Sequence, residues 1–332
     1  MGFIGSHTVV ALYQSGYLPI IIDNLQNSFK FVYDNITQIL GVKVPFYELD
    51  CNNKTELTSV FLKEGNIEGL IHFAADKAVG ESVDKPLKYY QNNLGSLITV
   101  LTLMEEHQVG KIVFSSSCTV YGEPDDLPVT ELTPKKQATS PYGNTKSMCE
   151  EILEDTVKAN NQLDVIALRY FNPIGAHPSA LIGELPIGTP NNLIPFITQT
   201  AIGKRKELTV FGSDYPTEDG SCIRDYIHVS DLAKAHVAAL DKKRIEGSYK
   251  VYNVGTGNGN SVFEVINTFE KVSGEKLTYK VGDRRLGDTT AVYADASLIQ
   301  KELNWEAEYS LEEALDSAWK WELSLKEKGS EV

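Results

Sequence analysis

The sequence predicts an α/β protein whose core is a doubly wound parallel sheet. In the first half of the chain, short apolar runs alternate with segments of helical periodicity, which is typical of parallel strands joined by crossover helices. Asp23, Asp50 and Ser117 each follow an apolar run, at the edge where open parallel sheets place their ligands. After residue 172 the chain becomes rich in proline and glycine. This change indicates a smaller, mixed region that follows the sheet.

Each predicted element rests on a local signal. The first helix follows Gly5 and runs to Ser15, where Gly16 supplies a C-terminal stop. Pro141 opens the last helix of the first half, and apolar residues follow it at core spacing. The predicted strands of the first half are 18–23, 45–48, 70–75, 111–117 and 165–170. The predicted helices are 6–15, 54–64, 86–108 and 142–160.

The chain divides into two predicted regions. Residues 1–172, together with about 222–243, form the sheet domain, because the helix predicted over 231–243 returns to pack on it. Residues 173–332 form a binding region with a strand over 208–211 and helices over 262–273 and 311–326. The five prolines between residues 173 and 195 indicate a structured binding segment at its start.

Composition excludes several classes of protein. The 332 residues carry a net charge of −14, which argues against a nucleic-acid surface. No run approaches the ~20 apolar residues of a membrane span, and no secretory signal is visible. The four cysteines are scattered without metal-type spacing, so we expect no metal site and free thiols in a reducing cytoplasm.

The first residues predict the end of a dinucleotide-binding turn. Gly2 and Gly5 precede a helix, and glycine lets the backbone approach a pyrophosphate at a helix N-terminus. Asp23 ends the next strand, where a carboxylate accepts hydrogen bonds from an adenosine ribose and repels a 2′-phosphate. We therefore expect NAD rather than NADP.

The dinucleotide fingerprint also calls for a strand and a first glycine before Gly2, and this sequence starts inside the motif. We therefore expect the first strand of the Rossmann-like sheet to be absent from this chain. Two interpretations stay open. Either the sequence is incomplete at its N-terminus, which we favour because nothing downstream looks eroded, or the product is truncated and binds the cofactor poorly.

A proton-transfer site is predicted after the strand at 111–117. Tyr142 and Lys146 are four residues apart and share one helix face, which brings the ammonium beside the phenol. A nearby cation lowers the pKa of a phenol, so Tyr142 can exchange a proton with a substrate hydroxyl while Ser117 orients it. This chemistry suits an alcohol being oxidised or a ketone being reduced.

Segments along nearly the whole chain resemble the UDP-glucose (UDP-galactose) 4-epimerase family of extended short-chain dehydrogenases/reductases. Two runs are specific to epimerases within that superfamily, namely 77–82 (KAVGES) and 171–179 (FNPIGAHPS). Other matching segments are 2–7, 72–74, 89–93, 114–117, 190–193, 214–220 and 224–229.

The resemblance implies inversion at C4 of UDP-glucose and UDP-galactose through a transient 4-ketose, with NAD bound throughout. It assigns Ser117, Tyr142 and Lys146 to catalysis. The implied cofactor residues are Gly2, Phe3, Ile4, Gly5, Asp23, Asn24, Asn27, Ser28, Asp50, Cys51, Phe73, Ala74, Ala75, Lys77, Asn92, Ser115, Tyr142, Lys146 and Phe171. The implied substrate residues are Ser117, Asn172, Asn192, Leu193, Thr209, Phe211, Arg224, Arg285, Asp288 and Val292. It also implies a cytoplasmic homodimer joined through helices 86–108 and 142–160.

Two positions depart from the family pattern. Asp76 stands where the family commonly has an apolar residue, and we expect its charge near Lys77 to weaken a cofactor contact. Val292 falls at the position where a bulky aromatic residue excludes N-acetyl groups, so the hypothesis is that this pocket admits UDP-N-acetyl sugars.

Three other functions suit this sequence less well. A 4,6-dehydratase needs an acid and a base after the strand-end hydroxyl, but Cys118 and Thr119 stand there. A simple dehydrogenase would need free exchange of NAD. An inactive truncated paralogue, or a nucleotide-sugar-binding protein without activity, is opposed by the intact set of Ser117, Tyr142 and Lys146.

Overall fold

The computed structural model describes residues 1–285, 288–327 and 329. Its helices are α1 (Phe3–Gln14), α2 (Phe31–Leu40), α3 (Lys54–Glu64), α4 (Val79–Asp84), α5 (Pro86–Glu106), α6 (Pro141–Ala159), α7 (Leu193–Ala201), α8 (Val229–Asp241), α9 (Val262–Ser273), α10 (Ser297–Leu303) and α11 (Leu311–Glu327), with the 3-10 turn η1 (Cys118–Tyr121). Its strands are β1 (Ile21–Asp23), β2 (Phe46–Glu48), β3 (Leu70–His72), β4 (Lys111–Ser117), β5 (Asp164–Tyr170), β6 (Asn172–Ile174), β7 (Leu208–Phe211), β8 (Ile223–His228), β9 (Ser248–Val254), β10 (Gly259–Ser261), β11 (Tyr279–Gly282) and β12 (Ala291–Val292).

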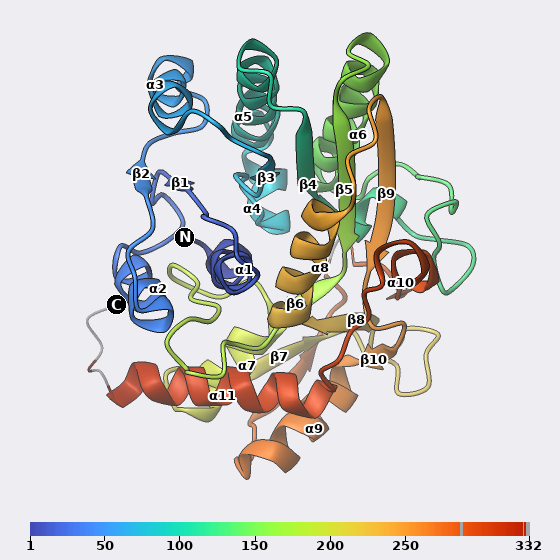
Figure 1. Cartoon of the computed structure of the whole chain (residues 1–332). Coiled ribbons are helices and arrows are strands. Elements are labelled where there is room, and N and C mark those ends of the chain that lie inside the picture. Colours follow the sequence, from blue (N-terminus) through green and yellow to red (C-terminus); the bar gives the residue numbers. More distant parts are fainter. Residues whose placement is uncertain (286–287, 328, 330–332) are drawn as a thin grey trace.

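The predicted parallel sheet is confirmed. Strands β3, β4, β5 and β9 form one parallel sheet in that order, and β1 pairs with β2 in a second parallel ladder (Figure 1). Among the described residues, β1 is bonded only to β2 and β3 only to β4. The expectation that the first strand of the sheet is absent from this chain stays a prediction.

Alternating side chains bury both faces of the four-stranded sheet. On β4, Ile112 and Phe114 pack with α5 and α6, whereas Val113 packs with α8 on the opposite face. The neighbouring β5 alternates in the same way, and all seven of its residues are buried. Burial on both faces explains why these strands read as continuous apolar runs.

The second region lies below the sheet in Figure 1 and surrounds β8, which pairs with β6, β10 and β12. Its core packs α7, α9 and α11 around Phe269 and Trp319. Because β6 follows directly from the end of β5, the second region begins at the carboxyl edge of the sheet.

Several predicted elements are confirmed with their bounds, among them β4, α3, α9 and β7. The predicted helix over 231–243 is α8, and it packs against α1 and β4 as expected. The sequence reading did not assign α2, α7, α10 or β9, and β9 forms the edge of the main sheet beside β5.

Candidate active site

One cavity of about 1700 Å³ follows the carboxyl ends of β1, β3 and β4 and continues into the second region. Its wall includes Asp23 at one end, Tyr142 in the middle, and Arg224 and Arg285 at the other. The predicted carboxyl edge of the sheet therefore joins the nucleotide-type residues, the proton-transfer residues and the arginines in a single continuous space.

The three predicted catalytic residues and all predicted cofactor residues line this cavity. They are Gly2, Phe3, Ile4, Gly5, Asp23, Asn24, Asn27, Ser28, Asp50, Cys51, Phe73, Ala74, Ala75, Lys77, Asn92, Ser115, Ser117, Tyr142, Lys146 and Phe171.

Most of the predicted substrate residues line the cavity as well, namely Asn172, Asn192, Arg224, Arg285, Asp288 and Val292. Within the described part of the chain, Leu193, Thr209 and Phe211 are not part of the cavity wall. Phe211 is next to that wall, because the guanidinium of Arg285, a lining residue, lies 5.3 Å from the centre of its ring. A substrate role for these three residues stays a prediction.

Tyr142 is placed by the start of α6. The Ser140 hydroxyl accepts a hydrogen bond from the Gly143 amide at 3.2 Å, and Pro141 occupies the first turn, so the helix begins at a fixed point. On the facing strand end, the Ser117 hydroxyl oxygen accepts hydrogen bonds from the Thr119 amide at 3.2 Å and the Thr119 hydroxyl at 3.0 Å. These contacts fix Ser117 and Tyr142 in the wall of the same cavity, where their side chains form a hydrogen bond.

The expected lowering of the Tyr142 pKa is not found in this structure. Burial raises the pKa of Tyr142 to about 12, and its hydrogen bond with Ser117 only partly offsets this rise. The reason is that Lys146 lies over the phenol ring, with its nitrogen 5.9 Å from the ring centre, and does not bond the phenol oxygen. With its pKa raised in this way, Tyr142 is a neutral phenol at neutral pH in this structure.

The Lys146 ammonium is held against the end of β4. It donates a hydrogen bond of 2.7 Å to the backbone carbonyl oxygen of Ser115 and lies 5.0 Å from the centre of the Phe114 ring. Burial lowers the pKa of Lys146 to about 8. The side chain therefore stays protonated at neutral pH and supplies a buried cation beside Tyr142.

The nucleotide end of the cavity has the chemistry of an anion and ribose site. Gly2 caps α1 without any side-chain hydrogen bond, and a Cβ built on Gly2 would meet no atom within 4 Å, so the first turn faces open space. Asp23 accepts hydrogen bonds from the Leu25 amide at 2.8 Å and the Ser28 hydroxyl at 2.9 Å. Its other oxygen lies 3.0 Å from the Met1 ammonium.

The opposite end presents two guanidinium groups around one carboxylate. Arg224 lies 3.5 Å from Asp288, and Arg285 lies 3.2 Å from the other oxygen of the same carboxylate. The Arg224 side chain is 13% exposed, so its charge faces the cavity rather than bulk water. Paired guanidinium forks suit an anionic diphosphate.

The side wall near this end is aliphatic. Val292 is buried and lines the cavity. The ring of the next residue, Tyr293, packs beside Gly259, where a Cβ built on that glycine would lie 2.9 Å from it. The aromatic side chain of Tyr293 is therefore directed toward Gly259 and is not part of the cavity wall, whereas Val292 is.

Sequence reasoning missed Glu184, which joins the two ends of the site. Its carboxylate accepts a hydrogen bond of 2.5 Å from the Asn192 amide and lies 3.6 Å from the Lys77 ammonium. Lys77 belongs to the predicted cofactor set and Asn192 to the predicted substrate set. The only signal in the sequence was the position of Glu184 within the proline-rich segment.

No group of three or more His, Cys, Asp or Glu side chains able to hold a metal ion occurs within residues 1–285, 288–327 and 329. In the same part of the chain, none of the helices combines the length and the apolar character that crossing a membrane requires.

Comparisons with known proteins agree on one family. A family model described as the NAD dependent epimerase/dehydratase family matches residues 1–255. The chain is 51% identical over 323 residues to UDP-glucose 4-epimerase of Bacillus subtilis, covering 97% of this chain and 95% of that protein.

Two solved structures are similar over nearly their whole length. One is UDP-glucose 4-epimerase from Bifidobacterium longum in complex with NAD+ and UDP, with a TM-score of 0.94, 47% identity, and 97% of this chain and 96% of that chain covered. The other is the enzyme from Stenotrophomonas maltophila with bound NAD and formylated UDP-arabinopyranose, with a TM-score of 0.95, 43% identity, and coverage of 99% and 97%.

Proposed function

Because the chain belongs to the NAD-dependent epimerase/dehydratase family, we propose that it is an isomerase that interconverts UDP-glucose and UDP-galactose. The reaction inverts C4 of the sugar through a transient 4-ketose, with NAD kept in the protein. Residues 1–172 with 222–243 hold the cofactor, and residues 173–332 hold most of the UDP-sugar. The observation that carries the proposal is the single cavity that joins Asp23, Tyr142 and Arg224.

The residues at the nucleotide end fit NAD. The first turn of α1 offers amide groups to a pyrophosphate, and the Asp23 carboxylate accepts hydrogen bonds from a ribose while opposing a 2′-phosphate. Asp50 and Asn24 extend this polar wall toward the adenine. When bound, NAD takes up the hydride from C4 of the sugar and returns it.

At the sugar, the protein moves one proton. Tyr142 removes the proton from the 4-hydroxyl when that carbon is oxidised and gives it back to the 4-oxygen after the ketose has turned in the cavity. Ser117 donates a hydrogen bond to the same oxygen and keeps it beside the phenol. The Lys146 cation, fixed to the Ser115 carbonyl, favours the ionised phenol once the site is filled.

At the far end, the two arginines hold the diphosphate. Arg224 and Arg285 share Asp288 in this structure, so they present both guanidinium groups to one place. Firm binding of the diphosphate leaves the sugar ring as the part that can rotate. Such an anchor allows either face of C4 to meet the same proton donor.

The test is to purify the protein, release its nucleotide by denaturation, and measure turnover of UDP-galactose with a coupled assay for UDP-glucose. We expect NAD in the released fraction and conversion in both directions without added NAD. A protein that binds UDP but converts neither sugar would instead be a nucleotide-sugar-binding paralogue. Activity that requires a stoichiometric supply of NAD would identify a simple dehydrogenase.

We also propose a cytosolic homodimer. Leu87 and Ile98 on α5 are 79% and 50% exposed, and Met148 on the neighbouring α6 is 37% exposed, which leaves an apolar strip over two adjacent helices. The four free cysteines suit a reducing compartment. Ile98→Lys should convert a dimer to a monomer in gel filtration with light scattering, whereas a wild-type monomer would contradict this part of the proposal.

A further inference from the structure

Asp76 is paired with Lys88, and this differs from the expectation that its charge would disturb Lys77. The Asp76 carboxylate is 14% exposed and lies 3.3 Å from the Lys88 ammonium on α5. Lys77 pairs with Glu184 on the other side of the cavity. The negative charge that Asp76 adds to the family pattern is therefore paired with the positive charge of Lys88.

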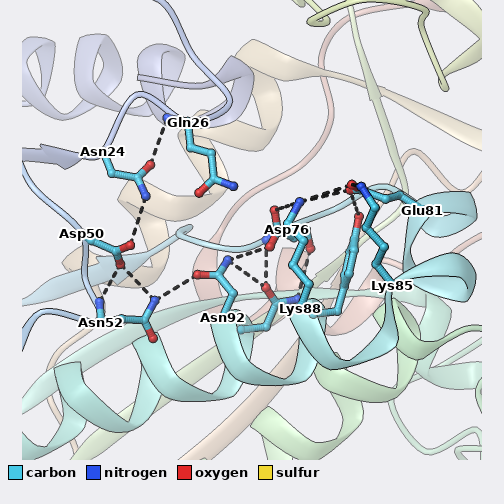
Figure 2. A network of polar contacts seen from close by, with 11 residues as sticks. Asn24, Gln26, Asp50, Asn52, Asp76, Glu81, Lys85, Lys88 and Asn92 are labelled. Atoms are coloured by element: carbon cyan, nitrogen blue, oxygen red, sulfur yellow. Dashed lines mark hydrogen bonds and ion pairs between the residues drawn. The ribbon is translucent and has the colours of Figure 1, made fainter.

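The same carboxylate also fixes the Asn92 side chain (Figure 2). The Asn92 amide nitrogen donates a hydrogen bond of 3.0 Å to Asp76, and its amide oxygen accepts one of 2.9 Å from Asn52. An ionised carboxylate only accepts hydrogen bonds, so the nitrogen of Asn92 must face Asp76 and its oxygen must face Asn52. An apolar residue at position 76 would remove this acceptor and leave the Asn92 nitrogen only its longer contact of 3.4 Å with the Asn93 side-chain oxygen.

This orientation reaches the predicted adenine end of the cavity. The Asn52 side-chain nitrogen that bonds Asn92 also donates a hydrogen bond of 2.9 Å to Asp50. Asp50 accepts a second bond of 2.8 Å from the Asn52 backbone amide. A continuous series of contacts therefore runs from Asp76 through Asn92 and Asn52 to Asp50 along one wall of the cofactor groove, as Figure 2 shows.

The backbone of Asp76 ties the same loop to the catalytic helix. Its amide donates to the Asn93 side-chain oxygen at 2.8 Å, and its carbonyl accepts from the Asn93 nitrogen at 3.1 Å. That nitrogen also donates to the Thr145 hydroxyl at 3.0 Å. Asn93 is 3% exposed, so this link between the loop and α6 is buried.

Lys88 extends the network to α4. Its ammonium lies 3.2 Å from Glu81, which also accepts a hydrogen bond of 2.9 Å from the Tyr89 hydroxyl and one of 3.1 Å from Lys85. The loop after β3, helix α4 and helix α5 all line the cavity, and Lys88 is the cation that they share. Charge-assisted contacts of this kind are stronger than neutral hydrogen bonds, and salt weakens them when they are partly exposed.

We propose that Asp76 is a positioning residue that sets how firmly the protein retains NAD, by orienting Asn92 and by fastening the loop after β3 through Lys88. The inference rests on the proposed function for the identity of the cofactor. It goes beyond that function because the family pattern gives residue 76 no such role. Asp76 itself takes no part in proton transfer.

The test measures retention of NAD in purified protein, as the rate at which bound NAD is lost into an excess of NAD-degrading enzyme. The variants are Asp76→Leu, Asp76→Asn and Lys88→Met, each at low salt and at about 0.5 M NaCl. Asp76→Leu should release NAD about tenfold faster, because both the ion pair and the orienting bond are lost. Asp76→Asn should release NAD at a rate between those of the wild type and Asp76→Leu, because an amide oxygen at position 76 can still accept a hydrogen bond from Asn92.

Lys85→Met is the matched control, because Lys85 pairs with Glu81 but does not touch Asp76. It should release NAD as the wild type does. In the wild type, added salt should speed the loss of NAD, and in Lys88→Met this salt effect should shrink.

Retention of NAD by Asp76→Leu at the wild-type rate under both conditions would overturn the proposal. So would equal acceleration in Asp76→Leu and Lys85→Met, because that result would indicate general loosening. Since retention is measured without any sugar nucleotide, failure of UDP-galactose turnover would count against the proposed function alone.

Discussion

The ammonium nitrogen of Lys146 lies 2.7 Å from the backbone carbonyl oxygen of Ser115. This bond ties the Lys146 cation to β4, the strand that carries Ser117. It explains why the ammonium does not bond the Tyr142 hydroxyl. The distance between charge and phenol oxygen is therefore set by the backbone of β4, not by the side chains alone.

Lys146→Met should lower kcat about 100-fold, because the buried cation that favours the ionised phenol is removed. Burial lowers the Lys146 pKa to about 8, so wild-type kcat should also decline as pH rises above about 8 and the ammonium loses its proton. The measurement is a pH profile of UDP-galactose turnover. Lys158→Met, on the exposed end of the same helix, is the control and should match the wild type.

Arg224→Lys should raise KM for UDP-galactose about tenfold and change kcat less, because a lysine cannot offer two parallel donors to a diphosphate. Steady-state kinetics over a wide range of substrate give both constants. Arg244→Lys, at an exposed position away from the cavity, serves as the control. A fall in kcat at unchanged KM would place Arg224 in the chemical step instead of in binding.

The aliphatic wall at Val292 predicts turnover of UDP-GalNAc by the wild-type protein. Val292→Tyr should abolish that activity and keep conversion of UDP-galactose within about tenfold, because a larger side chain in the cavity wall disfavours the bulkier N-acetyl sugar more than the smaller one. Assays with both sugar nucleotides decide the matter. No detectable conversion of UDP-GalNAc by the wild type would reject the hypothesis.

Buried histidines predict loss of stability in mild acid. Burial lowers the pKa of His236 to about 4, whereas an unfolded histidine titrates near 6.5. Below pH 6.5 the unfolded chain therefore binds more protons than the folded one, and the free energy of unfolding should fall by up to about 1.4 kcal/mol per pH unit for this residue. This loss of stability ends as the pH approaches the pKa of His236 in the folded protein, about 4.

The measurement is urea unfolding at pH 7 and pH 5. His236→Asn should be less stable at pH 7 but should show a smaller drop between the two pH values. An unchanged drop in His236→Asn would contradict the account.

The strands of the main sheet were predictable because both faces are buried. Residues 111–117 form an uninterrupted buried run, so the sequence marked β4 with its bounds. Strand β9 was missed because the exposed Lys250 interrupts its apolar pattern, and the first half of the strand is only partly buried at the edge of the sheet. Helix α2 was missed because it begins after Lys30, without a capping side chain.

The site residues that stand at the end of a strand or the start of a helix were predictable from the sequence. Ser117 ends a strand and Tyr142 opens a helix, so both could be placed from the sequence. The pKa of Tyr142 could not, because burial outweighs the spacing to Lys146. Glu184 and the pairing of Asp76 with Lys88 could not be predicted either, since each joins residues from separate elements.

The central claim is that Tyr142 moves the proton at O4 of the sugar, and Tyr142→Phe tests it most directly. The account predicts that kcat for UDP-galactose falls at least about 1000-fold while bound NAD is retained, because phenylalanine fills the same space without a proton to give. Tyr279→Phe, at an exposed position on β11, should turn over normally. Turnover by Tyr142→Phe within tenfold of the wild type would contradict the account.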